Sequence, residues 1–200
     1  MVTERNSVRL AFKEGINPDA KIILVDQDGV LADFEGEFLR RWQKKYPDLP
    51  YVPYEQRSSF YLYDDYPKEL RRQIEDIYFA RGFFGSLPPI DGALEAIKAM
   101  KKEGYIVKIC TSPLTGNKDC LTEKHNWIEK HLGKEWIRDL IISSDKTLVY
   151  GDYLIDDKPD IHGTLVPSWE HIVFDTPYNR SVNNGKRRIN NWHQWKKILE

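Results

Sequence analysis

Lys21-Ile-Ile-Leu-Val-Asp-Gln-Asp-Gly-Val-Leu-Ala-Asp33 is the stretch that decides the fold of this 200-residue chain. Its apolar run Ile22–Val25 is short and β-rich, as in a strand that is buried on both faces. Asp26 and Asp28 follow directly, and residues two apart in an extended chain point to the same side. Gly29 lets the backbone turn sharply there. We therefore expect two carboxylates just beyond the end of a buried strand.

Short apolar runs alternate with helical patterns along much of the chain. This alternation predicts an α/β fold with a Rossmann-like, mostly parallel sheet. The further expected strands are Tyr105–Cys110, Leu140–Ser143, Tyr153–Ile155 and Ile172–Phe174. Apolar stripes at helical spacing predict helices near residues 34–46, 70–78, 91–100, 121–132 and 192–199, the third of them capped by Asp91.

Residues 34–88 interrupt the alternation. They contain two helical patterns and an aromatic-rich connection, Tyr51–Tyr66, but no convincing buried strand. We expect this segment to be a small helical cap, inserted after the first strand into an α/β core of residues 1–33 and 89–200. Parallel sheets bind ligands beyond the carboxyl ends of their strands, where such a cap would sit.

The composition excludes several classes of protein. Lys and Arg total 30 and Asp and Glu total 31, so the chain has no bulk charge to attract nucleic acid or a membrane surface. No apolar run approaches the ~20 residues that span a membrane. Residues 1–20 lack the apolar stretch of a secretory signal. We expect a cytoplasmic protein with no membrane and no nucleic-acid partner; the oligomeric state is left open, with a homodimer as one option.

A second acidic pair, Asp156 and Asp157, follows another apolar run. If the two strands are neighbours, three or four carboxylates converge, and they need a cation to be stable. Hard oxygen ligands suit Mg²⁺. Thr111 and Ser112 end a third run and Lys146 follows a fourth, so hydroxyls and a cation could bind phosphate at the same edge. Since a carboxylate can attack phosphorus while a neighbouring acid protonates the leaving group, the pattern predicts a magnesium-dependent phosphatase.

Each element also has a simpler interpretation. Asp28-Gly29 is a hairpin signal, but a helical stripe follows it rather than an alternating strand. The spacing from Asp26 to Glu37 imitates a calcium loop, but Leu31 stands where that loop requires glycine. Asp156-Asp157 alone would more often be a solvated turn or a helix cap. The prediction depends on the order of the motifs, each at the end of a separate strand.

Four segments resemble the motifs of the haloacid dehalogenase-like phosphatases and, more narrowly, of the cytosolic and mitochondrial 5'(3')-deoxyribonucleotidases. They are Asp26–Asp33, Ile109–Pro113, Asp145–Thr147 and Leu154–Pro159, and the resemblance covers about residues 20 to 199. It implies hydrolysis of a small-molecule nucleotide through an aspartyl-phosphate, and the expected substrate is a pyrimidine (deoxy)nucleoside monophosphate such as dUMP or dTMP.

The resemblance also implies roles for single residues. Asp26 is the expected nucleophile, and Asp28 is the expected acid that protonates the nucleoside oxygen and then activates water. Mg²⁺ is expected on the Asp26 carboxylate, the Asp28 main-chain oxygen and Asp157, with Asp156 close by. The phosphate is expected on Thr111, Ser112, Lys124 and Lys146. The nucleoside is expected against Phe34, Phe60, Tyr61, Leu62, Tyr78 and Phe84.

The aromatic content of residues 51–84 agrees with such a pocket, since a base stacked between rings gains roughly 1–3 kcal/mol. We expect about half of those rings to face the ligand. One departure from the family pattern is Ser144, which stands where an arginine is expected.

Three other functions stay open at this stage. The first is a related phosphatase acting on a ribonucleotide or a sugar phosphate. The second is a nucleic-acid-binding module built on Lys186-Arg-Arg188 with Trp192, Trp195, Lys196 and Lys197. The third is a catalytically silent binding protein on the same fold.

Overall fold

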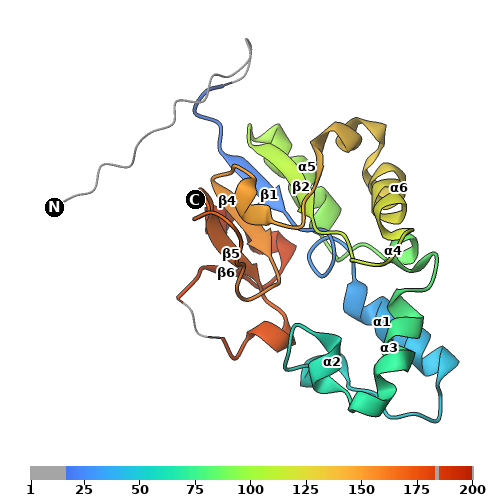
Figure 1. Ribbon diagram of the computed structural model, residues 1–200. Coiled ribbons are helices and arrows are strands. Elements are labelled where there is room, and N and C mark those ends of the chain that lie inside the picture. The colour runs from blue at the N-terminus through green and yellow to red at the C-terminus, as the bar shows by residue number, and fades with distance from the viewer. Residues whose placement is uncertain (1–16, 183–184, 200) are drawn as a thin grey trace.

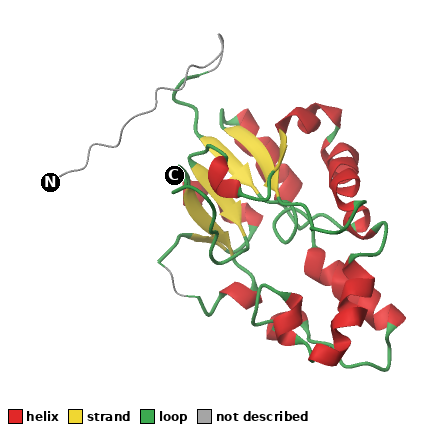
Figure 2. Ribbon diagram, in the orientation of Figure 1, coloured by secondary structure: helices red, strands yellow, loops and turns green. Residues whose placement is uncertain are grey.

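A single parallel sheet forms the centre of the computed structural model, which describes residues 17–182 and 185–199 (Figures 1 and 2). Residues 1–16 lie outside the described residues. They make up most of the segment 1–20 in which the sequence shows no secretory-signal pattern. The strand order is β3-β2-β1-β4-β5-β6. The strands are β1 (Ile22–Val25), β2 (Ile106–Thr111), β3 (Leu140–Ile142), β4 (Tyr153–Asp156), β5 (Glu170–Phe174) and β6 (Arg188–Ile189). The predicted α/β class with a Rossmann-like sheet is confirmed.

The register of the central strands brings their carboxyl ends together. Val25 of β1 lies opposite Ile109 of β2 on one side and Ile155 of β4 on the other. The residues that follow in each strand therefore emerge at one edge of the sheet. Compared with the predicted runs, β2 and β4 extend one residue further, to Thr111 and Asp156, and β5 begins earlier, at Glu170.

Seven α-helices occur in the described residues. They are α1 (Phe34–Lys45), α2 (Leu62–Asp65), α3 (Arg71–Tyr78), α4 (Phe83–Ser86), α5 (Ala93–Lys102), α6 (Cys120–Leu132) and α7 (Trp195–Leu199). The first begins where it does because the Asp33 carboxylate accepts a hydrogen bond from Gly36 N at 2.9 Å.

The prediction that Asp91 caps α5 is wrong. The capping residue is Gly92, with a left-handed backbone at φ 71° and no side-chain cap. The Asp91 carboxylate lies instead 3.2 Å from Nε2 of His193. A glycine in the left-handed region thus turns the chain into α5 without help from a side chain.

The insertion (residues 34–88) carries the helices α1 to α4, which loops and two short 3-10 helices connect; all of its residues are described, and none of them forms a strand. Figure 1 shows these helices gathered beyond one end of the sheet, with α4 beside α6. Buried side chains of the insertion, such as Ile74 and Phe83, belong to the same apolar cluster as Val25 of β1. The division into core and cap stays a prediction. Among the described helices, none has the length and apolar character to cross a membrane.

Candidate active site

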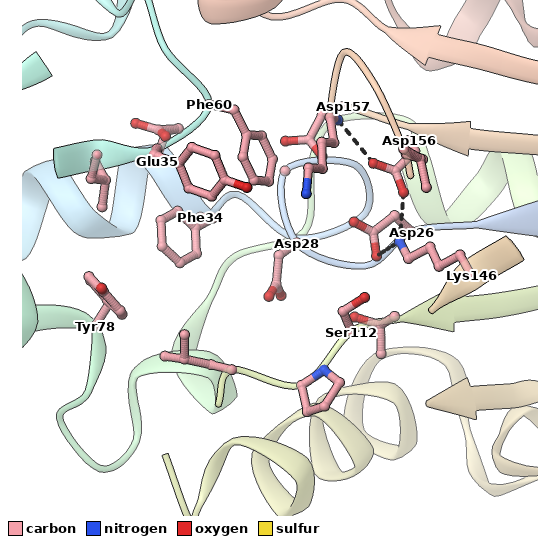
Figure 3. Close-up of a pocket in the computed structure, with 18 of the residues that line it drawn as sticks. Asp26, Asp28, Phe34, Glu35, Phe60, Tyr78, Ser112, Lys146, Asp156 and Asp157 are labelled. Carbon is pink, nitrogen blue, oxygen red and sulfur yellow. Dashed lines mark hydrogen bonds and ion pairs between the residues drawn. The ribbon is translucent and has the colours of Figure 1, made fainter. Parts of the chain in front are cut away.

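Three carboxylates meet at the carboxyl edge of β1 and β4. Asp26 follows β1, Asp156 ends β4 and Asp157 comes next, and one oxygen of each lies within 4.8 Å of the others. Figure 3 shows the three side chains together on one side of the cavity. Carboxylates this close repel one another unless a cation lies among them. A set of three hard oxygen donors fits a small divalent cation such as Mg²⁺.

Lys146 supplies a positive charge to this cluster from the short 3-10 helix Lys146–Leu148, which follows β3. Its Nζ lies 2.8 Å from Asp26 Oδ1 and 2.6 Å from Asp156 Oδ2. Burial lowers the pKa of Lys146, but the Asp156 and Asp26 carboxylates more than offset this, so its pKa stays above the ordinary value. Burial raises the pKa of Asp26 even though Lys146 opposes the shift. Lys146 is therefore a permanent cation between two acidic groups.

Asp28 has a different environment, two residues further along the chain. Lys124 of α6 places Nζ 2.7 Å from Asp28 Oδ2 and donates to Thr111 Oγ1 at 2.6 Å. Asp28 Oδ1 is buried and has no hydrogen-bond partner. Burial raises the pKa of Asp28, against the opposing charge of Lys124. A carboxyl group that holds its proton more readily is suited to act as a general acid.

Tyr178 and Asn179 hold Asp157, and neither residue is among the site residues predicted from the sequence. They lie in the short 3-10 helix Pro177–Asn179 after β5. The Tyr178 hydroxyl donates to Asp157 Oδ2, and Asn179 Nδ2 donates to the Asp157 carbonyl oxygen at 2.7 Å. Burial raises the pKa of Tyr178 well above its ordinary value, so the hydroxyl keeps its proton. A lone tyrosine 21 residues after Asp157 carries no sequence signal that links the two.

A cavity of about 340 Å³ opens between this edge of the sheet and the insertion. That volume lies within the range of small-molecule sites. Figure 3 shows Asp28 between the acidic cluster and the rings of Phe34, Phe60 and Tyr78. Every site residue predicted from the sequence lines the cavity: Asp26, Asp28, Phe34, Phe60, Tyr61, Leu62, Tyr78, Phe84, Thr111, Ser112, Lys124, Lys146, Asp156 and Asp157.

The cavity also has lining residues that the prediction did not include. They are Gly29, Glu35, Tyr63, Pro113, Leu114, Lys158, Ile161, His162 and Tyr178, together with Ser144, which was noted only as a departure. Loop and charged positions such as these give no periodic signal. Lys158 lies over the rings of Phe60 and Tyr61, with Nζ 5.3 and 5.6 Å from their centroids.

The aromatic wall consists of two groups of rings. Phe34 contacts Phe83 edge-on at 5.2 Å between centroids and also packs against Phe84 at 6.2 Å. Phe60 and Tyr61 form a second pair, 5.1 Å apart, in which Tyr61 is 54% exposed. Of the aromatic residues between 51 and 84, those that line the cavity are Phe60, Tyr61, Tyr63, Tyr78 and Phe84; which of them face a ligand stays a prediction.

Comparison with known proteins gives a consistent result. The family model for "5' nucleotidase, deoxy (Pyrimidine), cytosolic type C protein" matches residues 20–199. The human cytosolic-type 5'(3')-deoxyribonucleotidase is 42% identical over 186 residues, which cover 89% of this chain and 92% of that protein. The mouse mitochondrial 5'(3')-deoxyribonucleotidase is also 42% identical over 186 residues, covering 89% and 84%.

Among solved structures, a HAD family hydrolase from Deinococcus radiodurans R1 with bound phosphate and sodium has the same fold. The TM-score is 0.57 at 16% identity, and the match covers 90% of this chain and 95% of that one.

Proposed function

Because this chain belongs to the 5'(3')-deoxyribonucleotidase family of haloacid dehalogenase-like phosphatases, we propose that it hydrolyses pyrimidine deoxyribonucleoside monophosphates, such as dUMP or dTMP, with Mg²⁺ and through an aspartyl-phosphate. The main observation that supports this proposal is that the carboxylates of Asp26 and Asp28 have different partners. Asp26 lies in the acidic cluster with Lys146, whereas Asp28 lies apart with Lys124 and Thr111.

The separate environments support separate roles. Asp26 attacks the phosphorus, and the phosphoryl group is transferred to its carboxylate as the bond to the nucleoside oxygen breaks. Asp28, the carboxyl group with a raised pKa on the cavity side, gives its proton to the departing oxygen. As a carboxylate it then takes a proton from the water that hydrolyses the aspartyl-phosphate. Lys146, Thr111 and Ser112 supply the positive charge and hydroxyl groups that bind the phosphate oxygens.

Asp26 and Asp157 are the residues that would hold Mg²⁺. Both side-chain oxygens of Asp156 already have partners, Lys146 Nζ at 2.6 Å and Lys158 N at 2.9 Å. Asp157 Oδ2 accepts from Tyr178, which leaves Oδ1 for a cation. This supports Asp157 as the direct ligand and Asp156 as its neighbour. When bound, the cation neutralises phosphate oxygens that would otherwise repel the Asp26 carboxylate.

The aromatic wall supports a substrate with a flat base. Phe34, Phe60 and Tyr61 line the cavity, and a nucleobase has a flat π-face that can stack on such rings. In this proposal the insertion is the cap that binds the nucleoside. The cytoplasmic location stays a prediction, since one relative has a cytosolic name and the other a mitochondrial one.

A nucleic-acid-binding module is less well supported. Each basic side chain of Lys186-Arg-Arg188 has an acidic partner: Asp160 at 2.8 Å, Glu170 at 2.6 Å and Asp175 at 2.9 Å. Trp192 and Trp195 are buried in the apolar core. The rings are therefore not available to stack on bases, and the three basic side chains are paired within the chain.

The test is phosphate release from dUMP, dTMP, dGMP, UMP and a sugar phosphate, with and without Mg²⁺. We expect the pyrimidine deoxynucleotides to be hydrolysed fastest and only with the metal. Asp26→Asn should abolish turnover while the chain remains folded by circular dichroism. Turnover in that variant would exclude Asp26 as the nucleophile, and faster release from sugar phosphates would exclude the nucleotidase proposal.

A further inference from the structure

Tyr178 is placed to control the orientation of Asp157. We propose that Tyr178 is a positioning residue that holds one carboxylate oxygen of Asp157 and so presents the other to the divalent cation. This inference rests on the proposed function, in which Asp157 is a direct cation ligand.

The first support is the set of contacts between Asp157 and the 3-10 helix that carries Tyr178. The Tyr178 hydroxyl donates to Asp157 Oδ2, and Asn179 donates to the Asp157 main-chain oxygen at 2.7 Å. Asn179 also donates to the carbonyl oxygen of Phe174 at 2.8 Å, and its Oδ1 accepts from Thr176 N at 3.1 Å. This helix therefore fixes both the side chain and the backbone of Asp157.

The second support is the packing of the Tyr178 ring, which is 3% exposed. The Arg57 guanidinium lies 5.7 Å from the ring centroid, and the Phe60 ring meets it edge-on at 6.0 Å. Arg57 is itself fixed, because it is fully buried and its Nε lies 3.0 Å from Glu35 Oε2. The insertion thus holds the tyrosine in the position from which it reaches Asp157.

The consequence for the cation follows from elementary hydrogen bonding. A phenol is protonated at neutral pH and can donate one hydrogen bond. Because that bond engages one lone pair of Oδ2 and fixes the rotation of the carboxylate, Asp157 can offer Oδ1 to a cation in one defined direction. Loss of a hydrogen bond to a ligating carboxylate weakens metal affinity about 10–100-fold in characterised sites.

The test is Tyr178→Phe, which removes only the hydroxyl and keeps the buried ring. Mg²⁺ binding to the full, metal-free chain is measured by titration calorimetry, and phosphate release is measured as a function of Mg²⁺ concentration. We expect the Mg²⁺ Kd to rise about 10–100-fold. We also expect saturating Mg²⁺ to restore most of kcat, and thermal unfolding of the metal-free chain to stay close to that of the parent.

Tyr46→Phe is the matched control, because its hydroxyl also donates to an aspartate, Asp76, at a position outside the cavity. It should leave the Mg²⁺ Kd unchanged. If Tyr178→Phe binds Mg²⁺ as tightly as the parent, or loses only thermal stability, the positioning role is wrong while the proposed function stands. If the parent chain itself does not bind Mg²⁺, both fail.

Discussion

Gly29 is the residue at which the turn after β1 meets the acidic cluster. Its φ is 73°, and a Cβ built on it would lie 2.3 Å from Asp157 Oδ2. We predict that Gly29→Ala loses about 1–2 kcal/mol of folding free energy from the left-handed backbone. Because Asp157 must also move, phosphate release should fall about 100-fold or more, as expected for an ångström-scale displacement at a reacting centre. Urea unfolding and phosphate release measure the two effects.

Gly104 separates these two effects, because its φ is 95° and a Cβ there meets nothing within 4 Å. Gly104→Ala should show a similar loss of stability with unchanged phosphate release. Equal losses of activity in both variants would mean that the contact with Asp157 does not explain the requirement for glycine at position 29.

At the scale of elements, Arg57 joins α1 to α2 within the insertion. Its buried guanidinium pairs with Glu35 of α1 at 3.0 Å and with Asp65 of α2. We predict that Arg57→Met destabilises the chain by about 3–5 kcal/mol, because it leaves two buried carboxylates without a cation. The free energy of urea unfolding measures this loss.

Arg40 provides the comparison on the same insertion. Its pair with Glu37, at 2.6 Å, has an arginine side chain that is 62% exposed, and Glu37 keeps a second partner in Arg41. Arg40→Met should therefore cost about 1 kcal/mol or less. A similar loss in the two variants would contradict the structural role given to Arg57.

Some elements could be predicted from the sequence because a short stretch of chain is enough to recognise them. Others could not, because they depend on residues far away in the sequence. Buried strands such as β1 are continuous apolar runs, so they can be recognised without knowing their neighbours. The strand β6 has only two residues, Arg188–Ile189, which is too short for any pattern. In the sequence, Arg57, Glu35 and Asp65 cannot be told from ordinary surface charges. Their burial as ion pairs depends on partners that only folding brings together.

At the scale of the whole molecule, the site depends on strand order. The sequence predicted that acidic and hydroxyl residues follow separate strands, and it left open whether those strands are neighbours. The order β2-β1-β4 at the centre of the sheet brings Thr111, Asp26 and Asp156 to one edge. Tyr178 comes from the turn after the next strand, β5, and no local pattern connects it to this edge.

The pH dependence of global stability depends on a buried histidine, His171 of β5. Burial lowers the pKa of His171 to about 4, and the nearby Lys186 adds to the effect. In the unfolded chain its pKa is close to 6.5. As the pH falls below that value, His171 binds a proton in the unfolded chain but stays neutral in the folded chain. The folded state therefore loses stability relative to the unfolded state until the pH reaches about 4. The pKa values of Asp26, Asp28 and Asp157 are raised, so these groups act in the opposite direction.

A comparison of two chains isolates the histidine from these carboxyl groups. His171→Leu replaces it with an apolar side chain that cannot titrate in a site that is 8% exposed. We predict that the parent loses about 2 kcal/mol relative to this variant between about pH 7.5 and about pH 5, measured as the free energy of urea unfolding. The difference should be constant above about pH 7.5, where both states of the parent hold a neutral imidazole. A difference that does not change with pH over the whole range would mean that His171 is protonated as readily in the folded chain as in the unfolded one.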